Sequence, residues 1–460
     1  MNSFHSLNPA DETVISTHQC TEFSDIDSFF LTCRTAFSVW RKKKYSERKT
    51  KILQLKDKLQ FYRNELSSLI ALETGKPLWE STAEVNGAIT KIDITIESFE
   101  ERMTSILFEK ESIQYRSVYK PIGVFVVIGP FNFPVHLPLG QIIPAVLSGN
   151  GVLFKPSEYT TGVGELVIKI LNEIEFPQGL IQLVKGNSKV GHYMVQHQQA
   201  DGVLFTGGYH AGRSISAECG SSPEKIVALE MGGNNPLVVS SYNDQEKVAS
   251  IIKQSAFLTA GQRCTCSRRL ILVGNQESLI ESLIQETKSI VLGSFQDDPE
   301  PYIGPLISQS SQDRLLQHYQ DVLHKGGQSI VPLEKVGDKG FFVSPGIVDV
   351  TSLYKELPDD EYFGPLLQII RVDSFEEAVD VANSTSYGLS SSLISTSRDE
   401  FDVFFDTIRA GVINWNRPTN GSSSRLPFGG VGKSGNFRPA GYFSVDFCSY
   451  PVASTLEDNI

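Results

Sequence analysis

Short apolar runs that alternate with helix-length stretches are the feature that most limits the fold of this chain. Five such runs begin at Gly123, and most of them end in glycine: GVFVVIG, GVLFK, LIQLVKG, GVLFTGG and KIVALEMGG. Amphipathic stretches of helical length lie between them, for example at 162–174 and 189–199. A strand, a helix and another strand in this rhythm are typical of parallel βαβ units.

A second series of apolar runs begins after Gly233, with NPLVVSS, RRLILVG, LLQIIRV, SSLIST and GVINWN. One of the helical stretches between them opens with a capping box, in which Ser374 and Glu377 are expected to cap the first turn. A chain of 460 residues is also too long for one ordinary core. The sequence therefore predicts two α/β domains in series.

The chain before these runs, from about Asp25 to Arg102, is helical in pattern and highly charged. Gly75 is expected to end a helix at its C-terminus. One apolar stripe runs along the helical pattern, and we interpret it as core packing. The stripe consists of Ile52, Leu55, Leu59, Tyr62, Leu66 and Leu69.

The net charge of −12 argues against a nucleic-acid or membrane-surface partner, because both require a basic face. No apolar run reaches the roughly 20 residues that a membrane span needs. The opening stretch MNSFHSLNPADETV lacks the basic and apolar regions of a secretory signal. We therefore expect a cytoplasmic protein.

The stretch TAGQRCTCSRR places Cys264 and Cys266 two positions apart. Structural zinc cysteines usually have two to four residues between them and a second pair elsewhere, so no metal site is predicted. A disulfide between these two would be strained, and six cysteines are too few for a disulfide scaffold, which indicates a reducing compartment. On spacing alone, two buried thiols and a nucleophile with a bystander both remain open.

Four other motifs place polar side chains at the ends of expected strands. Glu230 in LEMGGNNP is either a general base or a structural cap, and Asn132 in GPFNFP is either an oxyanion donor or a turn residue. Lys155 and Glu158 in FKPSE could bind ribose hydroxyls or form a solvated loop pair. The stretch LFTGGYHAG leads a strand into a helix N-terminus, where a pyrophosphate can bind.

The stretch PFGGVGKSG contains a GxGxxG pattern and ends like a phosphate-binding loop. That loop would need a glycine at Pro427 and a following helix, and NFRPAGY follows instead. We interpret the stretch as a glycine-rich loop of the active site or of an interface.

Together, these motifs resemble the aldehyde dehydrogenase superfamily. GPFNFP, FKPSE, FTGG, LEMGGNNP, GQRCTC, EYFGP and PFGGVGKSG occur in its order and at about its spacing, from about Ala36 to the end of the chain. The resemblance implies two doubly wound parallel-sheet domains with a small β bridging element. It assigns 1–102 and 122–232 to an NAD-binding domain, 233–440 to a catalytic domain, and 103–121 and 441–460 to an oligomerisation element.

The resemblance also implies the role of each site residue. Cys264 is the nucleophile with Cys266 as a bystander, Glu230 is the general base, and Asn132 is the oxyanion donor. The cofactor is NAD rather than NADP, because the Glu158 carboxylate would repel a 2′-phosphate. The residues expected to bind NAD are Lys155 and Glu158 at the adenine ribose, Gly207, Gly208, Tyr209, His210, Ala211 and Gly212 at the pyrophosphate, and Glu361 and Phe363 at the nicotinamide ribose and ring.

Gly208 stands where the superfamily usually has serine, so one hydroxyl contact to the cofactor phosphate is expected to be missing. Longer stretches such as AGQRCTCSRRL and GKSGNFRPAGYFSVDFCSYPVAS resemble one member whose semialdehyde substrate carries two carboxylates. Arginine suits carboxylates through its two-pronged geometry. The arginines expected to line the substrate mouth are Arg263, Arg417, Arg425 and Arg438.

The stretches at 112–120 and 447–454 resemble the family's bridging strands, which implies a homo-oligomer, with a dimer as the expected form. Two other classes of protein stay open at this stage. One is a non-catalytic protein that keeps the fold, although Cys264, Glu230 and Asn132 are all present. The other is a cysteine hydrolase, which would need a histidine base, and the sequence links neither His136 nor His210 to the thiol.

Overall fold

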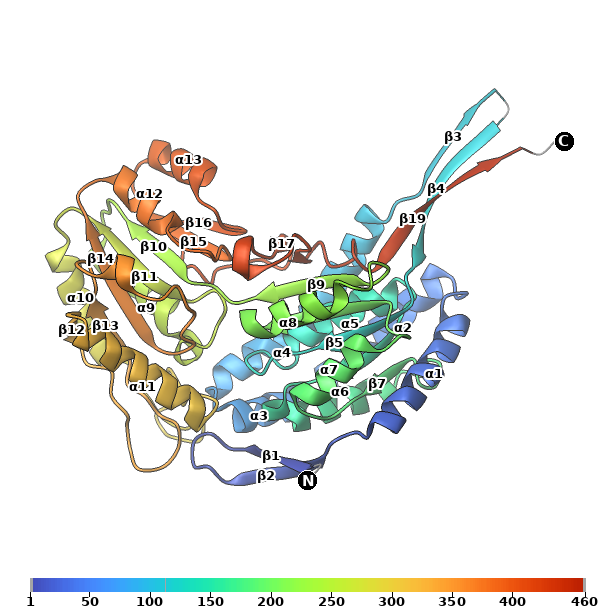
Figure 1. The fold of residues 1–460 in the computed structure, drawn as a ribbon, viewed down its shortest axis with the longest axis horizontal. Helices are drawn as coiled ribbons and strands as arrows, with labels where there is room; N and C mark the ends of the chain where they lie inside the picture. Colours follow the sequence, from blue (N-terminus) through green and yellow to red (C-terminus); the bar gives the residue numbers. More distant parts are fainter. Residues whose placement is uncertain (1–2, 112, 458–460) are drawn as a thin grey trace.

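The computed structural model describes residues 3–111 and 113–457. Two lobes lie beside each other, each built around one large sheet, and a narrow three-stranded arm projects away from them (Figure 1). This arrangement confirms the predicted fold class. In the described part of the chain, no helix is both long enough and apolar enough to cross a bilayer.

The first lobe contains a parallel five-stranded sheet with the order β7-β6-β5-β8-β9. All five runs predicted after Gly123 form strands, which are β5 Val124–Ile128, β6 Gly151–Lys155, β7 Ile181–Leu183, β8 Gly202–Gly207 and β9 Ile226–Met231. The helices α5 His136–Leu147, α6 Thr161–Asn172, α7 Ser188–Gln196 and α8 Tyr209–Cys219 connect them. The strand order reverses at β5, and ligands of such sheets bind at the carboxyl ends of the strands near this point.

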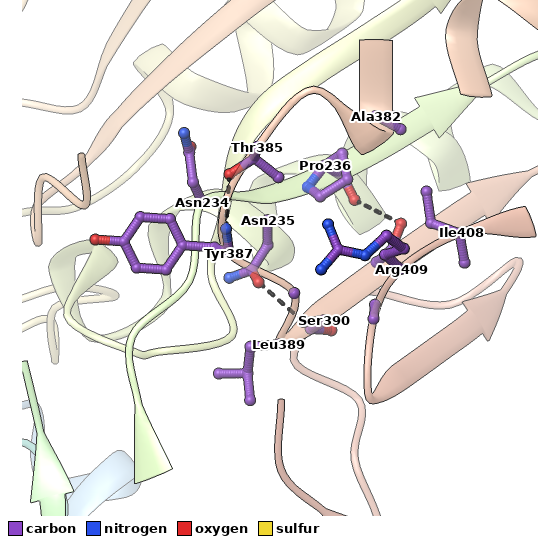
Figure 2. Close-up of a pocket in the computed structure, with 13 residues that line it drawn as sticks. Asn234, Asn235, Pro236, Ala382, Thr385, Tyr387, Leu389, Ser390, Ile408 and Arg409 are labelled. Carbon is purple, nitrogen blue, oxygen red and sulfur yellow. Dashed lines mark hydrogen bonds between the residues drawn. The ribbon is translucent and has the colours of Figure 1, made fainter. Parts of the chain in front are cut away.

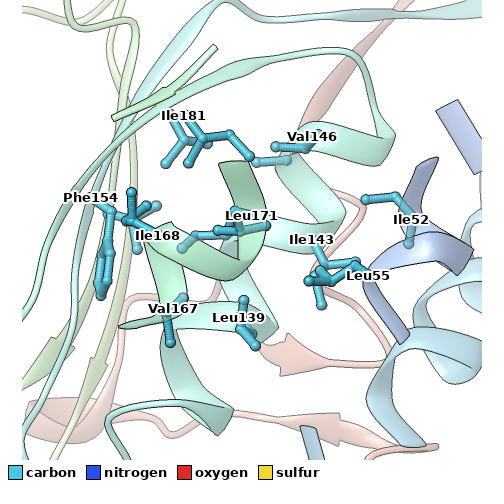
Figure 3. Packing of buried hydrophobic residues seen from close by; sticks show 14 of the residues in the cluster. Ile52, Leu55, Leu139, Ile143, Val146, Phe154, Val167, Ile168, Leu171 and Ile181 are labelled. Carbon is cyan, nitrogen blue, oxygen red and sulfur yellow. The ribbon is translucent and has the colours of Figure 1, made fainter. Parts of the chain in front are cut away.

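In the core of this lobe, the sheet packs against the helices that connect its strands and against helices from the N-terminal part of the chain. Phe154 of β6 packs with Leu139 of α5 and Val167 of α6, and Ile52 and Leu55 join the same cluster (Figure 3). The N-terminal helices are α1 Phe23–Trp40, α2 Tyr45–Phe61, α3 Arg63–Thr74 and α4 Leu78–Arg102. The predicted stripe is confirmed as core packing, although the helix breaks at Tyr62 and the stripe continues on α3.

Two local predictions about helix ends have clear outcomes. Gly75 ends α3 with a φ of +73°, as expected. Ser374 caps the helix that follows it, because its Oγ accepts the Glu377 backbone N–H at 3.1 Å. The Glu377 carboxylate accepts instead from the backbone N–H of Asp373, so the reciprocal half of the predicted capping box is displaced by one residue.

The second lobe contains a seven-stranded sheet with the order β12-β13-β14-β11-β10-β15-β16. The five runs predicted after Gly233 form β10 Asn235–Val239, β11 Ser267–Val273, β14 Leu366–Val372, β15 Ser390–Ile394 and β16 Val412–Trp415. Two strands at one edge were not predicted, β12 Gln328–Val331 and β13 Gly346–Asp349, and β12 is antiparallel to β13. The helices are α9 Gln245–Phe257, α10 Glu277–Lys288, α11 Gln309–His324, α12 Phe375–Asn383 and α13 Arg398–Thr407.

Small antiparallel sheets complete the fold. The arm consists of β3 Ile106–Lys110, β4 Ile113–Pro121 and β19 Ser449–Leu456, in the order β19-β4-β3. Ser112, which opens one of the predicted bridging strands, lies outside the described residues, as do 1–2 and 458–460 at the chain ends. The other pairs are β1 Ser3–Leu7 with β2 Val14–Gln19, and β17 Pro427–Phe428 with β18 Ala440–Gly441. The domain boundaries given above stay predictions.

Candidate active site

A cavity of about 1140 Å³ lies between the two lobes, at the carboxyl ends of β5, β6, β8 and β9. Residues from distant parts of the chain meet in its walls. Among them are most of the side chains that the sequence motifs singled out: Asn132, Lys155, Glu158, 207–211, Glu230, Arg263, Cys264, Glu361 and Phe363.

The two cysteines of the TAGQRCTCSRR stretch have different surroundings. Cys264 is partly buried and lines the cavity. Cys266 is 0% exposed, and its thiol donates to the Leu258 carbonyl at 3.7 Å. Burial raises the pKa of the Cys264 thiol, and the Glu361 and Glu230 carboxylates raise it further. Only Cys264 can therefore meet a ligand in the cavity, and it must lose its proton before it can act as a nucleophile.

The loop before Cys264 is held in an unusual backbone conformation. Thr259 and Ala260 have φ values of +55° and +50°, which side-chain-bearing residues rarely adopt. Gly261 follows with a φ of +71°, and a Cβ atom built there would lie 2.1 Å from the Gly364 carbonyl oxygen. Only glycine fits at this point. The loop is thus fixed by tight packing rather than by regular secondary structure.

Asn235 fixes the same loop from the second lobe. Its amide Nδ2 donates to the Cys264 carbonyl at 2.7 Å and to the Cys266 carbonyl at 2.9 Å. Its Oδ1 accepts from the Ser390 backbone N–H at 2.9 Å (Figure 2). The pocket drawn around these residues holds only about 10 Å³, which is at most the space of one water molecule. We interpret it as part of the support for the Cys264 loop.

Asn132 lies in the turn between β5 and α5, and it is 5% exposed. Its Nδ2 donates to the Gln262 carbonyl at 2.9 Å, which ties the amide to the loop that carries Cys264. One N–H of an amide group remains after such a bond, because the group has two donors. Asn132 is therefore placed to donate to an oxygen atom bound beside Cys264.

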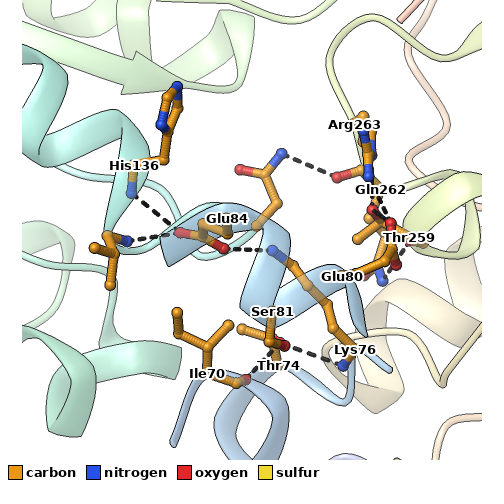
Figure 4. Close-up of polar contacts among 12 residues, drawn as sticks. Ile70, Thr74, Lys76, Glu80, Ser81, Glu84, His136, Thr259, Gln262 and Arg263 are labelled. Carbon is orange, nitrogen blue, oxygen red and sulfur yellow. Dashed lines mark hydrogen bonds and ion pairs between the residues drawn. The ribbon is translucent and has the colours of Figure 1, made fainter. Parts of the chain in front are cut away.

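A buried carboxylate holds the turn that carries Asn132. Glu84 of α4 accepts from the backbone N–H groups of Val135 at 2.8 Å and His136 at 3.1 Å (Figure 4). Its other oxygen pairs with Lys76 at 2.6 Å, and the Lys76 ammonium lies 4.0 Å from the centre of the Phe133 ring. The pair satisfies the first N–H groups of α5, which have no partner inside the helix.

Glu230 is the last residue but one of β9 and is 7% exposed. Its Oε2 is buried without a hydrogen-bond partner among the described residues. Burial raises the pKa of its carboxyl group well above the ordinary value, and Lys91 opposes that shift. A Cβ atom at Gly429 would lie 2.7 Å from its Oε1, so the glycine-rich loop packs directly on this carboxylate. A buried carboxyl group with a raised pKa has the properties of a general base.

The end of β6 places Lys155 and Glu158 at one end of the cavity. Lys155 is buried, and its ammonium donates to the carbonyls of Pro156 and Gly186, both at 2.8 Å. The Glu158 carboxylate lies 3.9 Å from that ammonium, and its side chain is 43% exposed. Lys155 is therefore locked in place, whereas Glu158 is free to accept hydrogen bonds from a ligand.

The N-terminus of α8 faces the same cavity. Gly208 is its N-cap residue, it supplies no side-chain cap, and a Cβ atom built there would meet nothing within 4 Å. A helix N-terminus with small residues before it is suited to an anionic group. Gly212 was expected to bind the pyrophosphate, but it does not line the cavity. It packs inward, and a Cβ atom there would lie 2.4 Å from the Met231 sulfur.

Glu361 and Phe363 reach the cavity from the loop before β14. Glu361 accepts from the Gly233 backbone N–H at 3.1 Å, and burial raises the pKa of its carboxyl group to about 7, which Arg268 opposes. A Cβ atom at Gly232 would lie 1.7 Å from the Glu361 Oε2, so the paired glycines make room for this side chain. The Phe363 ring packs edge-on against Phe131, with centroids 5.9 Å apart.

Three of the four arginines expected at the substrate mouth, Arg417, Arg425 and Arg438, lie outside the cavity. All three are exposed, and none lines the cavity. Arg425 pairs with Glu97 at 2.5 Å, and Arg438 donates to the Phe437 carbonyl at 3.3 Å. Of these four, Arg263 alone lines the cavity, where it pairs with Glu80 at 2.5 Å (Figure 4). A position next to a motif in the sequence therefore does not determine where an arginine side chain points.

The sequence reasoning missed one whole face of α4. Glu80, Glu84, Gly87 and Lys91 all line the cavity, and their spacing of four, three and four residues places them on one side of the helix. This spacing is readable in the sequence. The role of this face was not predicted, because charged residues on a helix usually face solvent.

The sequence model of the aldehyde dehydrogenase family matches residues 1–452. The chain belongs to this family. Among its relatives is the N-succinylglutamate 5-semialdehyde dehydrogenase of Novosphingobium aromaticivorans, which is 42% identical over 437 residues, or 94% of this chain and 92% of that protein. The enzyme of the same name from Chromobacterium violaceum is 39% identical over 455 residues, or 98% of this chain and 93% of that protein.

Solved structures of the family have the same fold. The betaine aldehyde dehydrogenase of Staphylococcus aureus in complex with NAD⁺ superimposes with a TM-score of 0.94 at 25% identity, over 100% of this chain and 92% of that one. A variant of the 1-pyrroline-5-carboxylate dehydrogenase of Thermus thermophilus gives a TM-score of 0.93 at 27% identity, over 99% of this chain and 90% of that one.

Proposed function

We propose that this protein oxidises an aldehyde to a carboxylic acid with NAD. The observation that carries the proposal is the meeting of Cys264, Asn132 and Glu230 in one cavity between the lobes. They supply a nucleophile, an oxyanion donor and a general base, which are the three groups that this reaction needs from the protein.

In the proposed reaction, the Cys264 thiolate adds to the aldehyde carbon and gives a thiohemiacetal oxyanion. Asn132 and the Cys264 backbone N–H stabilise that oxyanion, an effect of about 3–4 kcal/mol for one donor in comparable sites. NAD held by the α8 N-terminus and Glu158 would supply the oxidant for the next step, a hydride acceptor for the same carbon, and loss of that hydride would leave a thioester on Cys264. Glu230 then takes a proton from water, and the resulting attack on the thioester releases the acid.

The residues at the end of the cavity that Lys155 and Glu158 occupy fit NAD. The N-terminus of α8 offers backbone donors to a pyrophosphate, and the open space at Gly208 leaves room for it. Glu158 offers a carboxylate to ribose hydroxyls and would repel a 2′-phosphate. The bound NAD⁺ in the Staphylococcus aureus relative supports the same cofactor for this chain. We therefore expect a higher kcat/KM with NAD than with NADP.

For the substrate, we propose N-succinyl-L-glutamate 5-semialdehyde, with N-succinyl-L-glutamate as the product, a step of arginine degradation in a reducing, cytoplasmic compartment. The two relatives of that name support it, at 42% and 39% identity over nearly the full length. A dehydrogenase of another semialdehyde is the second candidate, because only one of the four arginines expected to bind the carboxylates lines the cavity.

The test combines purified protein, NAD and a panel of semialdehydes, and follows NADH by its absorbance. The proposal expects the highest kcat/KM for the N-succinylglutamate semialdehyde and no signal from a Cys264→Ala variant. A protein that formed no NADH from any aldehyde would contradict the function. A protein that preferred another semialdehyde would contradict only the substrate.

A cysteine hydrolase finds little support in the site. His136 is the cavity histidine beside Asn132, and burial together with Lys91 and Lys76 lowers its pKa to about 3. Its Nδ1 faces Gly87 of α4, where a Cβ atom would lie 3.3 Å away. An imidazole that resists protonation and faces a helix is poorly suited to activate Cys264.

A further inference from the structure

Lys91 is a buried cation that the proposed chemistry does not use. It projects from α4 into the cavity and is only 5% exposed. Two cations near α4 have carboxylate partners, since Lys76, which does not line the cavity, pairs with Glu84, and Arg263, which does, pairs with Glu80. Within residues 3–111 and 113–457, no carboxylate lies within 4 Å of the Lys91 ammonium, and no hydrogen bond to it is formed.

The space around Lys91 is kept open by glycines on two facing helices. A Cβ atom at Gly140 of α5 would lie 3.7 Å from the Lys91 Cε and 3.9 Å from its Nζ. At Gly87 of α4, a Cβ atom would lie 3.3 Å from the His136 Nδ1. Larger side chains at these positions would fill the part of the cavity between α4 and α5. Gly87, Gly140 and Lys91 all line the cavity, and we call the part that they line the branch between α4 and α5.

The titratable groups that interact with this charge are Glu230 near the end of β9, which stabilises it from a distance, and His136 on α5. Neither forms an ion pair with Lys91. Burial raises the pKa of the Glu230 carboxyl group, and the charge of Lys91 opposes that shift, so the two groups interact although they form no ion pair within 4 Å. Burial lowers the pKa of Lys91 to about 8, so at neutral pH most of it still carries its proton. A buried ammonium without a counter-charge is costly, and an anionic ligand would remove that cost.

The geometry points to Lys91 as the cation that binds a carboxylate of the substrate, in the branch of the cavity between α4 and α5. The inference rests on the proposed function, because it assigns an acidic aldehyde to the same site. It also replaces Arg417, Arg425 and Arg438, which lie outside the cavity, as the source of positive charge. A carboxylate on Lys91 would hold the far end of the aldehyde while its carbonyl group lies at Cys264.

The experiment compares two aldehydes with wild-type protein and with Lys91→Met, which keeps the length of the side chain and removes its charge. The aldehydes are N-succinylglutamate 5-semialdehyde and hexanal, which has no carboxylate. We expect the variant to raise KM for the semialdehyde by about 10- to 150-fold, the range for loss of a hydrogen bond to a charged group. The KM for hexanal should change less than about twofold. Arg425→Met, at an exposed site outside the cavity, is the matched control and should leave both values unchanged.

A binding measurement without NAD separates recognition from catalysis. Calorimetry with glutarate as the probe should show binding to the wild-type protein and at least tenfold weaker binding to Lys91→Met. At pH 8.5 the wild-type protein should also take up protons on binding, because a bound carboxylate restores the charge of Lys91. His136 stays neutral in this range, since its pKa is about 3.

The outcomes are distinguishable. If Lys91→Met lowers kcat equally for both aldehydes and binds glutarate normally, Lys91 serves Glu230 instead and the inference fails while the proposed function stands. If Lys91→Met behaves as wild type in both measurements, the inference also fails. If wild-type protein oxidises neither aldehyde, the proposed function itself fails.

Discussion

At the scale of single residues, two neighbouring thiols show how burial assigns roles that sequence spacing leaves open. Cys264 lines the cavity, whereas Cys266 is fully buried two positions later. We expect Cys264→Ala to lower kcat by at least about 10³-fold, because the covalent step is lost. Cys266→Ala should keep most of the activity and reduce only stability, by about 1 kcal/mol. NADH formation and thermal unfolding of both variants test this, and reversed effects would remove Cys264 as the nucleophile.

Glu230 gives a prediction about pH. A general base must be ionised, and burial raises the pKa of this carboxyl group, so it ionises at a higher pH than an ordinary glutamate does. The steady-state rate should therefore rise with pH in the range where Glu230 loses its proton. Glu230→Gln should lower that rate by about 10²- to 10⁴-fold and abolish the rise.

The first turnover of Glu230→Gln should differ from its steady state. One equivalent of NADH should still form in a burst, because the variant blocks hydrolysis of the thioester rather than its formation. Stopped-flow absorbance measures the burst directly. Loss of the burst together with the steady-state rate would assign Glu230 to an earlier step.

Sequence motifs located the residues whose direction is set by the local backbone. Asn132 and Cys264 lie in turns and Glu230 lies inside β9 near its end, so their motif also determines where they point. Arg425 and Arg438 are equally close to motifs, but their long side chains turn to Glu97 and to a backbone carbonyl instead. Long flexible side chains take the partner that tertiary structure offers, and a local pattern does not contain that partner.

At the scale of elements, buried carboxylates from α3 and α4 cap the N-termini of two helices of the first lobe. Glu73 of α3 accepts from the backbone N–H groups of Gly162 at 3.0 Å and Val163 at 2.9 Å, at the start of α6. Glu84 of α4 does the same for α5. These contacts join helices that are far apart in the sequence, and in the second case they also hold the turn of Asn132.

The Glu84 cap gives a prediction about stability and activity together. Glu84→Gln leaves the Lys76 ammonium buried without a counter-charge, and breaking a buried pair in this way costs about 3–5 kcal/mol. We expect the free energy of unfolding in urea to fall by that amount and kcat to fall with it, because the turn of Asn132 loses its support. Asp402→Asn, in the exposed pair with Arg398, is the control and should change neither value. If the two variants changed the free energy of unfolding and kcat equally, the buried pair would contribute no more than the exposed pair.

Most strands inside the two large sheets were predictable from the sequence, and the four-residue strand β13, between β12 and β14, is an exception. β5, β6, β10 and β11 are buried on both faces and read as continuous apolar runs. The edge strand β12 and the hairpin formed by β1 and β2 are half exposed and have mixed polar sequences. Their pairing depends on the neighbouring strand rather than on their own composition, which explains why they were missed.

At the scale of the whole molecule, the active site exists only where the two lobes meet. The first lobe supplies Asn132 and Glu230, and the second supplies Cys264 and Glu361. The tie between Asn132 and the Gln262 carbonyl crosses this boundary, as does the ion pair between Glu80 and Arg263. The order of these motifs can be read from the sequence. The cavity, however, depends on how the two lobes pack against each other, and no single motif contains that information.

The arm leads to the last prediction, which concerns assembly. It projects from the first lobe (Figure 1), and β3 at its edge carries three apolar side chains that are largely exposed, Ile106 at 61%, Leu107 at 68% and Phe108 at 55%. An unpaired edge strand with an apolar surface invites a second chain. We therefore expect light scattering to give twice the chain mass of 50.8 kDa, or a higher multiple. Leu107→Lys should shift the protein toward 50.8 kDa, because a charge on this edge opposes pairing. Phe61→Glu changes another exposed apolar side chain, 79% exposed on α2, and should leave the mass unchanged. A wild-type protein of 50.8 kDa at all concentrations would show that the arm serves no assembly.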